Sequence, residues 1–333
     1  MSTSPIVTAD RLTKEFYAGF WRPRPHRALD ALSFEVPEGG VFGLLGPNGA
    51  GKSTTLKLLM DLLKPTSGRA ALLGRPAGDV RARQRVGFLP ENPTFYDQLS
   101  AEELLVYFAG LFGYSGHDRV RRASVVLDRV GLGADRRRPL RQYSKGMIQR
   151  VGLAQALVND PALVILDEPM SGLDPVGRRE VRDIIIGLRD EGRTVLFSSH
   201  ILSDAELLCS RVGILARGRL VASGPTAELT ASGTPGWEVV LTSVPPDLAD
   251  QLRVVAARVT QIDTTRYSVE LADDMKPETL VANAAAAGAS LVSVTPLRTT
   301  LEDVFLRAVG LDTPDARVAG QTARAAGPVE NDR

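Results

Sequence analysis

The sequence predicts an α/β protein with a mostly parallel core sheet, followed by a smaller α+β domain. Short apolar runs alternate with segments of helical periodicity over the first two thirds of the chain, as expected for strands joined by helices in one sheet. A segment rich in Ser, Gly and Pro at 231–236 then precedes a region with a different order of strands and helices. We expect a main domain over 1–230, a second domain over 237–310 and a disordered tail over 311–333.

Composition argues against several classes of protein. The 333 residues carry 40 Lys and Arg against 39 Asp and Glu, so no basic field favours nucleic acid, and no nucleic-acid partner is expected. Cys209 is the single cysteine, which excludes an internal disulfide and suits a reducing compartment. No apolar run approaches the roughly 20 residues of a spanning helix. The sequence therefore predicts a cytoplasmic chain whose membrane contact is indirect, through a partner.

A glycine-rich loop stands between a predicted strand, Val41 to Leu45, and a predicted helix, Thr55 to Leu63, and matches the pattern G-x-x-x-x-G-K-[ST]. Glycines let the backbone turn successive N–H groups toward a phosphate, Lys52 adds a positive charge, and the opening helix adds its dipole. The alternative is a plain turn that caps a helix, and the flanking strand and helix argue against it. The predicted phosphate-binding residues are Gly46, Pro47, Asn48, Gly49, Ala50, Gly51, Lys52, Ser53 and Thr54.

Two strands are predicted before this loop, at Ile6 to Ala9 and at Leu32 to Val36, with an irregular segment at 16–27 between them. Aromatic side chains in that segment can stack on an adenine ring, as aromatic faces do on bases generally. We favour Phe16 for this role, with Tyr17 as the second choice. The alternative is that these aromatics only cover the edge of the sheet.

A helical stretch follows the strand Val86 to Leu89 and the turn at Pro90 and Glu91. Ser100 and Glu103 have the spacing of a capping box, and the residues after them are apolar at helical intervals. We therefore expect residues 100 to about 155 to be mostly helical.

Acidic and basic side chains follow two further buried strands. Asp167 and Glu168 come directly after the run 162–166, and His200 follows the run 194–197. The carboxyl ends of parallel strands form the ligand-binding edge of such a sheet, so these side chains should approach the phosphate loop. Ser53 and Asp167 can then bind Mg²⁺, and Glu168 can orient or deprotonate the attacking water. An acidic strand end that caps a helix is the alternative.

Residues 143–150, Tyr-Ser-Lys-Gly-Met-Ile-Gln-Arg, resemble the signature sequence L-S-G-G-Q-x-Q-R of ATP-binding-cassette (ABC) ATPases. The other motifs follow in the order of that family, and the match covers roughly residues 5 to 225. The resemblance implies a P-loop NTPase cassette with an antiparallel N-terminal subdomain and a helical subdomain at about 92–155. It implies ATP and Mg²⁺ as cofactors and ATP hydrolysis as the activity. It assigns His200 to the γ-phosphate and Asp174 to the loop that couples two sites.

The same resemblance implies a second ABC subunit, because Ser144 and Gly146 of one chain face the ATP of the other. That subunit is either an identical copy or a close homologue. A serine that opens a helix presents a hydroxyl and backbone amides to an anion, which supports this reading independently. Alternatively, Ser144 only caps its own helix, and ATP binding is monomeric.

This sequence departs from the family pattern in two places. Tyr143, Lys145 and Met147 replace the common Leu, Gly and Gln of the signature, a variant that looks like that of export-type cassettes. Glu91 stands where the family has a glutamine that contacts the metal ion and the attacking water. A carboxylate there adds negative charge beside the γ-phosphate.

The second domain contains strands near 237–243, 258–263, 266–271 and 290–294, with helices near 246–256 and 277–287. The order βαββαβ predicts a small ferredoxin-like unit. With the run at 301–306, it resembles the accessory domain of bacterial export cassettes, and we expect it to be a regulatory or dimer-stabilising lobe without chemistry of its own.

Together, the motifs and the resemblance predict an ATPase subunit on the cytoplasmic face of the membrane that drives a separate transmembrane permease, as part of an exporter. Two alternatives belong to other classes. One is a soluble ABC ATPase that acts on ribosomes or DNA, for which a second cassette, a long coiled coil or a basic arm would be expected. The other is a regulatory module that closes on ATP with little turnover.

Overall fold

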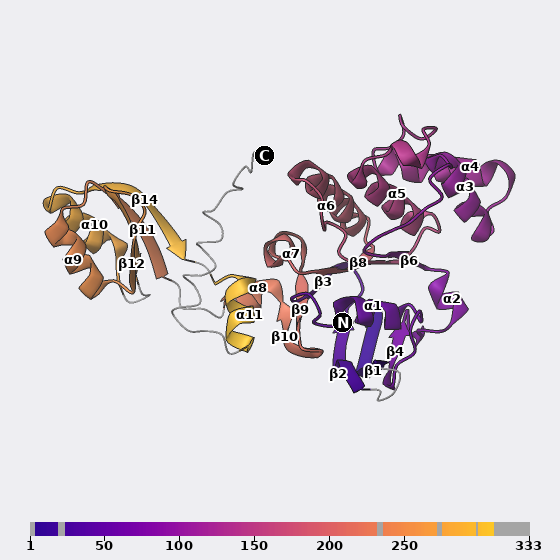
Figure 1. Ribbon diagram of the computed structural model, residues 1–333, viewed down its shortest axis with the longest axis horizontal. Helices are drawn as coiled ribbons and strands as arrows, with labels where there is room; N and C mark the ends of the chain where they lie inside the picture. The colour runs from indigo at the N-terminus through magenta and orange to yellow at the C-terminus, as the bar shows by residue number, and fades with distance from the viewer. Residues whose placement is uncertain (1–3, 19–23, 232–235, 272–274, 298, 310–333) are drawn as a thin grey trace. The chain divides into compact units, whose positions relative to one another are not determined.

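The computed structural model describes residues 4–18, 24–231, 236–271, 275–297 and 299–309 (Figure 1). By its contacts the chain divides into two compact units. The first comprises Met1–Thr226 with Phe305–Arg333, and the second comprises Ala227–Val304.

The main sheet of the first unit has six strands in the order β10-β9-β3-β8-β7-β6. Five of these strands run parallel, and β10 pairs antiparallel with β9 at one edge. The central strands are buried along nearly their whole length, which explains their continuous apolar sequences. The strands are β3 (Gly40–Leu45), β6 (Val86–Leu89), β7 (Leu163–Leu166), β8 (Thr194–Ser199), β9 (Arg211–Ala216) and β10 (Arg219–Pro225).

A second, antiparallel sheet of the first unit has the order β2-β1-β4-β5. The helix α1 (Lys52–Leu59) joins it to the main sheet, because Leu56 and Leu59 are fully buried in a cluster that contains residues of both sheets. The strands are β1 (Val7–Ala18), β2 (Arg24–Val36), β4 (Ser67–Leu72) and β5 (Arg75–Pro76).

The strands β1 and β2 are longer than the sequence predicts. The prediction of an irregular segment at 16–27 is wrong for the described residues of that range. Phe16 pairs with His26, and Tyr17 pairs with Pro25. The residues at 19–23 lie outside the described part of the chain. The pair has register shifts after Ala9, Leu12 and Lys14, and these bulges interrupt the strict alternation of apolar and polar residues by which a strand is recognised.

Helices cover the main sheet, and three of them form the helical region, α3 to α5 (Figure 1). The capping box predicted at Ser100 and Glu103 is confirmed at the start of α3. The helices are α2 (Val80–Arg83), α3 (Ala101–Leu111), α4 (Gly116–Arg129), α5 (Lys145–Leu157), α6 (Pro175–Asp190), α7 (Leu202–Leu208) and α8 (Thr226–Ala231), with a 3-10 turn at Leu140–Gln142.

The helix α5 rests directly on the backbone of β6. A Cβ atom at Gly87 of β6 would lie 1.9 Å from the carbonyl oxygen of Ala156, and one at Gly152 of α5 would lie 2.5 Å from Leu89. At Gly87 only glycine permits so close an approach, because the neighbouring atom belongs to the backbone, whereas Gly152 meets the side chain of Leu89.

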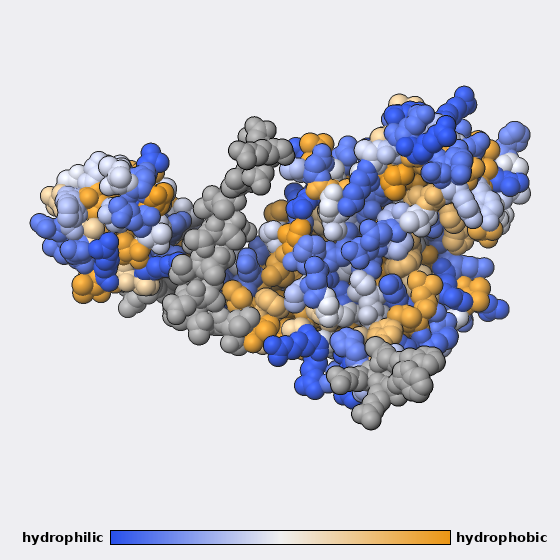
Figure 2. Space-filling view, in the orientation of Figure 1, coloured by the Kyte–Doolittle hydropathy of each residue, from blue (hydrophilic) through white to orange (hydrophobic). Residues whose placement is uncertain are grey.

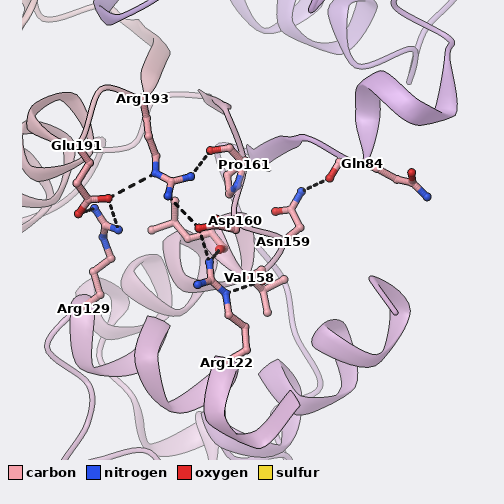
Figure 3. A network of polar contacts seen from close by, with 10 residues as sticks. Gln84, Arg122, Arg129, Val158, Asn159, Asp160, Pro161, Glu191 and Arg193 are labelled. Atoms are coloured by element: carbon pink, nitrogen blue, oxygen red, sulfur yellow. Dashed lines mark hydrogen bonds and ion pairs between the residues drawn. The ribbon is translucent and has the colours of Figure 1, made fainter. Parts of the chain in front are cut away.

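A polar network joins α4 to the turns that precede β7 and β8 (Figure 3). Arg122 bonds the last carbonyls of α5 and pairs with Asp160, which also pairs with Arg193. Arg129 makes two hydrogen bonds, of 2.7 and 2.9 Å, to Glu191, and they hold the pKa of that carboxyl below its ordinary value. Through these contacts the helical region is anchored at the amino-terminal ends of β7 and β8.

The second unit has the predicted order βαββαβ, and its antiparallel sheet runs β12-β13-β11-β14. Its core lies between the sheet and two helices, around Val239, Leu241, Leu252, Val269 and Leu280. The elements are β11 (Gly236–Thr242), α9 (Pro246–Val255), β12 (Arg258–Gln261), β13 (Arg266–Leu271), α10 (Pro277–Ala286) and β14 (Ser290–Leu297), and α11 (Leu301–Val309) follows across the boundary between the units.

Candidate functional site

The phosphate loop connects β3 to α1 and depends on glycine for its shape. Gly46, Gly49 and Gly51 have φ angles of 148°, 80° and 107°. A Cβ atom at Gly46 would lie 2.2 Å from the carbonyl oxygen of Leu215, so a side chain is also excluded there by space. No side chain caps the amides at the start of α1, where Gly51 is the N-cap residue. These amides are therefore available to an anion.

Lys52 is buried at the floor of this loop, with 5% of its side chain exposed. Its ammonium donates to the carbonyl oxygens of Gly46 at 2.7 Å and Pro47 at 3.1 Å, and it pairs with Glu168 Oε1 at 3.1 Å. The charge is thus held inside the loop by its own backbone and by one carboxylate.

Ser53 and Asp167 meet beside the loop, at the carboxyl end of β7. Ser53 Oγ donates to Asp167 Oδ1 over 3.0 Å. Ser198, at the end of β8, donates to the same oxygen over 2.7 Å and accepts the backbone N–H of Glu168 over 2.8 Å. Sequence reasoning assigned no role to Ser198, although its place two residues before His200 on a buried strand was a usable signal.

Glu168 lies between Lys52 and His200 and is 6% exposed. Its Oε2 is 2.8 Å from His200 Nδ1, and its Oε1 is the oxygen that pairs with Lys52. Its backbone has a φ of 48°, a left-handed conformation that residues other than Gly, Asn and Asp rarely adopt. Both carboxylate oxygens of Glu168 are therefore engaged, and strained local backbone holds them there.

A pocket of about 390 Å³ opens over the loop and brings most of the predicted residues together. Glu91, at the end of β6, and Phe16, on β1, both line it, whereas Tyr17 is not among the lining residues. The ammonium of Lys14 lies 5.2 Å from the centre of the Phe16 ring. The lining residues are Phe16, His26, Ala28, Asn48, Gly49, Gly51, Lys52, Ser53, Thr54, Glu91 and Glu168.

Two predicted loop residues and one unpredicted residue complete this picture. Pro47 contributes its carbonyl to Lys52, and Ala50 is buried in the hydrophobic core rather than in the pocket. His26 lines the pocket opposite Phe16 because β1 and β2 pair there. Sequence reasoning misses His26, because its place depends on a hairpin whose sequence predicts a loop.

Ser144, Gly146 and Asp174 do not line this pocket. Ser144 is exposed and accepts the N–H of Met147 at the start of α5, over 3.3 Å. Asp174 is the N-cap of α6 and accepts the N–H of Gly177 over 2.8 Å. A Cβ at Gly172 would lie 2.2 Å from Lys145 Nζ, so the first turn of α5 lies against the loop that leads to Asp174. These residues form a second, exposed surface of the first unit.

The two surfaces are connected through α5. Gln149 is buried, and its amide donates to the carbonyl oxygen of Pro169 over 3.0 Å, next to Glu168. The helix that begins at Ser144 is thereby tied to the loop that carries the carboxylate of the pocket.

The parallel sheet, the phosphate loop and the carboxylates at its edge define a P-loop nucleoside triphosphatase. The family model described as ABC transporter matches residues 29–171. An uncharacterized ABC transporter ATP-binding protein of Synechocystis is 44% identical over 91% of this chain and 84% of its own length. The chain belongs to the ABC transporter ATP-binding proteins, and it is an ATPase.

Other relatives support the same assignment. The linearmycin resistance ATP-binding protein of Bacillus subtilis is 31% identical over 85% of this chain and 93% of its own length. Among solved structures, an ATP-binding cassette in a dimeric post-hydrolysis state with ADP and Pi superposes with a TM-score of 0.60. It is 26% identical, over 66% of this chain and 98% of its own. The predicted family, fold class and activity are confirmed.

Proposed function

We propose that this chain dimerises on two Mg-ATP complexes and drives a separate membrane permease that exports its cargo. The observation that carries the ATPase part is the buried group of Lys52, Glu168 and His200 at the phosphate loop, beside the Ser53 and Asp167 pair. A triphosphatase needs a held γ-phosphate, a metal ion across the β and γ oxygens, and a positioned water, and this group offers a residue for each.

Ser53 and Asp167 would hold the magnesium ion. Mg²⁺ prefers oxygen ligands and retains several waters, and a hydroxyl and a carboxylate 3.0 Å apart at the mouth of the loop fit that preference. When bound, the ion neutralises charge on the β- and γ-phosphates. Glu91 lines the same pocket and is proposed as a further ligand of the ion or of its waters.

Glu168 is proposed to orient the attacking water, and it must first be released from its present contacts. Lys52 holds Oε1 and His200 holds Oε2. A triphosphate in the loop competes for the Lys52 ammonium and for His200, since both side chains also pair with phosphate oxygens. Binding of the substrate therefore frees the carboxylate that the reaction needs. Phe16 is proposed to stack on the adenine, because it lines the pocket.

Ser144, Gly146 and Asp174 are proposed to contact the ATP held by a second ABC subunit, either an identical chain or a close homologue. Their surface is exposed and separate from the pocket, so one chain does not use it on its own nucleotide. A relative cassette of known structure is a dimer.

A groove in the helical region is proposed as the docking site of the permease. It has a volume of about 560 Å³, is lined by apolar and aromatic residues and includes Tyr96, Tyr107 and Phe108. Tyr96 and Tyr107 are 76% and 60% exposed, a large aromatic area for a water-facing surface. Figure 2 shows the surface around α3 to α5 as mostly hydrophilic with smaller apolar areas.

The proposed location is the cytoplasmic face of the membrane, with indirect membrane contact through the permease. Among the described residues, no helix has the length and apolar character to span a bilayer. The near-balance of 40 basic and 39 acidic residues supports a protein partner rather than nucleic acid. Export is supported by the linearmycin resistance relative. We propose residues 1–230 as the cassette, with a helical subdomain at about 92–155, and 237–310 as the regulatory or dimer-stabilising accessory domain.

Glu168→Gln tests the proposed reaction. The variant keeps the shape of the side chain and removes its basic oxygen, so it should bind ATP with unchanged affinity and lose steady-state hydrolysis by about a hundredfold or more. It should also accumulate a dimer with ATP, seen by size-exclusion chromatography with light scattering. Glu35→Gln, at an exposed position of β2, is the matched control and should behave as wild type.

The same trapped variant tests the partner. Tagged Glu168→Gln, extracted gently from native membranes with ATP, should bring down a polytopic membrane protein in near-equal amount. Recovery of ribosomal proteins or nucleic acid without a membrane protein would refute the transport role and leave the ATPase. Unchanged turnover in the variant would refute the role of Glu168.

A further inference from the structure

The helix α7 follows His200 directly, and its anchoring decides where that histidine lies. Only Ile201 separates His200 from the first residue of α7, and no side chain caps the helix at Ile201. Three residues of α7 are buried, namely Asp204, Ala205 and Leu208. Asp204 is the acidic one among them, with 8% of its side chain exposed. A buried carboxylate needs a partner, and Arg182 provides it.

Arg182 belongs to α6, whose N-cap residue is Asp174. The Arg182 Nη2 to Asp204 Oδ1 distance is 3.4 Å. The pair therefore links the helix that follows His200 to the helix that follows Asp174. His200 contacts the pocket residue Glu168, and Asp174 lies on the exposed second surface.

The contact between Arg182 and Asp204 is incomplete. Arg182 Nε and Asp204 Oδ2 are both buried and make no hydrogen bond within the described part of the chain. An arginine and a carboxylate side by side can make two parallel bonds, through Nε and one Nη. Here one long bond is made, and the atoms that would form the second are present, shielded from water and unsatisfied. A small approach of α7 to α6 would satisfy both.

We propose that Arg182 and Asp204 are a positioning pair for ATP hydrolysis. The pair completes its second bond when the site closes on nucleotide, and it thereby sets the position of His200 relative to Asp174. This inference rests on the proposed function of His200 and Asp174. Neither residue of the pair lines the pocket over the phosphate loop, so the pair acts through the loop that carries His200. Because this ion pair joins α6 to α7, movement of the loop that carries His200 is coupled to movement of the surface that carries Asp174.

The kinetic test compares Arg182→Met and Asp204→Asn with wild type in the full chain. Each variant should lower kcat by about tenfold to a hundredfold, since small misplacements of reacting groups have effects of that size. ATP affinity should change by less than about twofold, because phosphate binding does not use the pair. The double variant should be no slower than the slower single variant, as expected for residues that act as one unit. Arg182→Lys, which keeps the charge but not the two-bond geometry, should be intermediate.

Arg189→Met is the matched control on the same helix. Arg189 is exposed and pairs with its neighbour Asp190, so its loss should leave kcat unchanged. Thermal melts of all variants separate this proposal from a purely structural role. If the pair only stabilises the fold, kcat per folded molecule at low temperature will equal that of wild type, and the proposal is wrong.

A direct readout of His200 distinguishes failure of this proposal from failure of the proposed function. The sequence contains three histidines, so histidine-selective NMR resolves each ring, with His200→Gln used for assignment. Arg182→Met and Asp204→Asn should shift the His200 ring signals, while Arg189→Met should not. Unshifted His200 signals in both variants would refute the pair. A wild-type chain that binds ATP but does not hydrolyse it would refute the proposed function and leave the NMR result standing.

Discussion

Two serines that begin helices of the first unit have the same local role and different surroundings. Ser100 is 7% exposed and forms a closed capping box, in which its hydroxyl accepts the N–H of Glu103 and the Glu103 carboxylate accepts the N–H of Ser100. Ser144 is exposed and accepts one N–H, that of Met147, over a longer distance. The Ser100 cap is reciprocal and closed within the chain. The Ser144 hydroxyl makes a single capping bond and stays exposed.

The comparison shows that the sequence can identify a helix N-cap residue without revealing whether that residue serves folding or ligand binding. Both serines have the residue type and spacing of helix N-caps. Burial and reciprocity separate them, because Ser100 is buried and its hydroxyl and amide both bond to Glu103, whereas the hydroxyl of Ser144 is exposed. We therefore expect loss of Ser100 to change stability and loss of Ser144 to change hydrolysis.

The largest effect is expected for Ser144→Arg. A long cationic side chain on the proposed subunit interface should reduce hydrolysis by about a hundredfold or more, while a monomer still binds ATP, because the pocket over the phosphate loop is untouched. ATPase assays and nucleotide titrations measure the two properties separately.

Ser115→Arg is the control for that substitution. Ser115 is also an exposed N-cap position, at α4, and its side chain makes no capping bond. It should hydrolyse ATP at the wild-type rate. If Ser144→Arg loses monomer binding as well, the substitution has damaged the fold and the contrast with Ser100 is not supported.

A moderate effect is expected for Ser100→Ala. Removing an N-cap side chain costs about 1 kcal/mol of unfolding free energy, here through the hydroxyl that accepts the Glu103 N–H. Urea titration should show the lower midpoint, and kcat at low temperature should equal the wild-type value. A loss of kcat without a loss of stability would contradict the proposal that Ser100 serves folding and Ser144 serves hydrolysis.

The smallest effect is a change in acid sensitivity. The backbone N–H of Ser100, followed by its hydroxyl, holds the pKa of Glu103 below its ordinary value of 4.5. The stabilisation is therefore present above the unfolded pKa and is lost as pH falls through the lower folded pKa. Glu103→Gln should reduce the loss of melting temperature between about pH 5 and about pH 3. An identical pH profile in both proteins would contradict this role.

Much of the pocket could be predicted because its residues occupy the ends of strands with simple patterns. The apolar runs before Asp167 and His200 give buried parallel strands, and such strands end at one edge of a sheet. The contact between Glu168 and His200, 32 residues apart, follows from that arrangement. The chemical roles of these residues stay predictions.

The elements that were missed are those whose signals are weak in sequence. The hairpin of β9 and β10 turns at Arg217 and Gly218, which both have positive φ angles, and this pair between two apolar runs was an available signal. The extension of β1 and β2 through Phe16 and His26 was hidden by bulges. The partial bond between Arg182 and Asp204 depends on how two helices pack, which no local pattern encodes.

The glycines at the interface of β6 and α5 also bear on stiffness. Main chain meets main chain at Gly87, where no side chain stands between the strand β6 and the carbonyl of Ala156 in α5. Side chains absorb small displacements by changing rotamer, and backbone in direct contact does not. A displacement of β6 at Gly87 would therefore move the adjacent end of α5 directly, with little of it taken up by side chains.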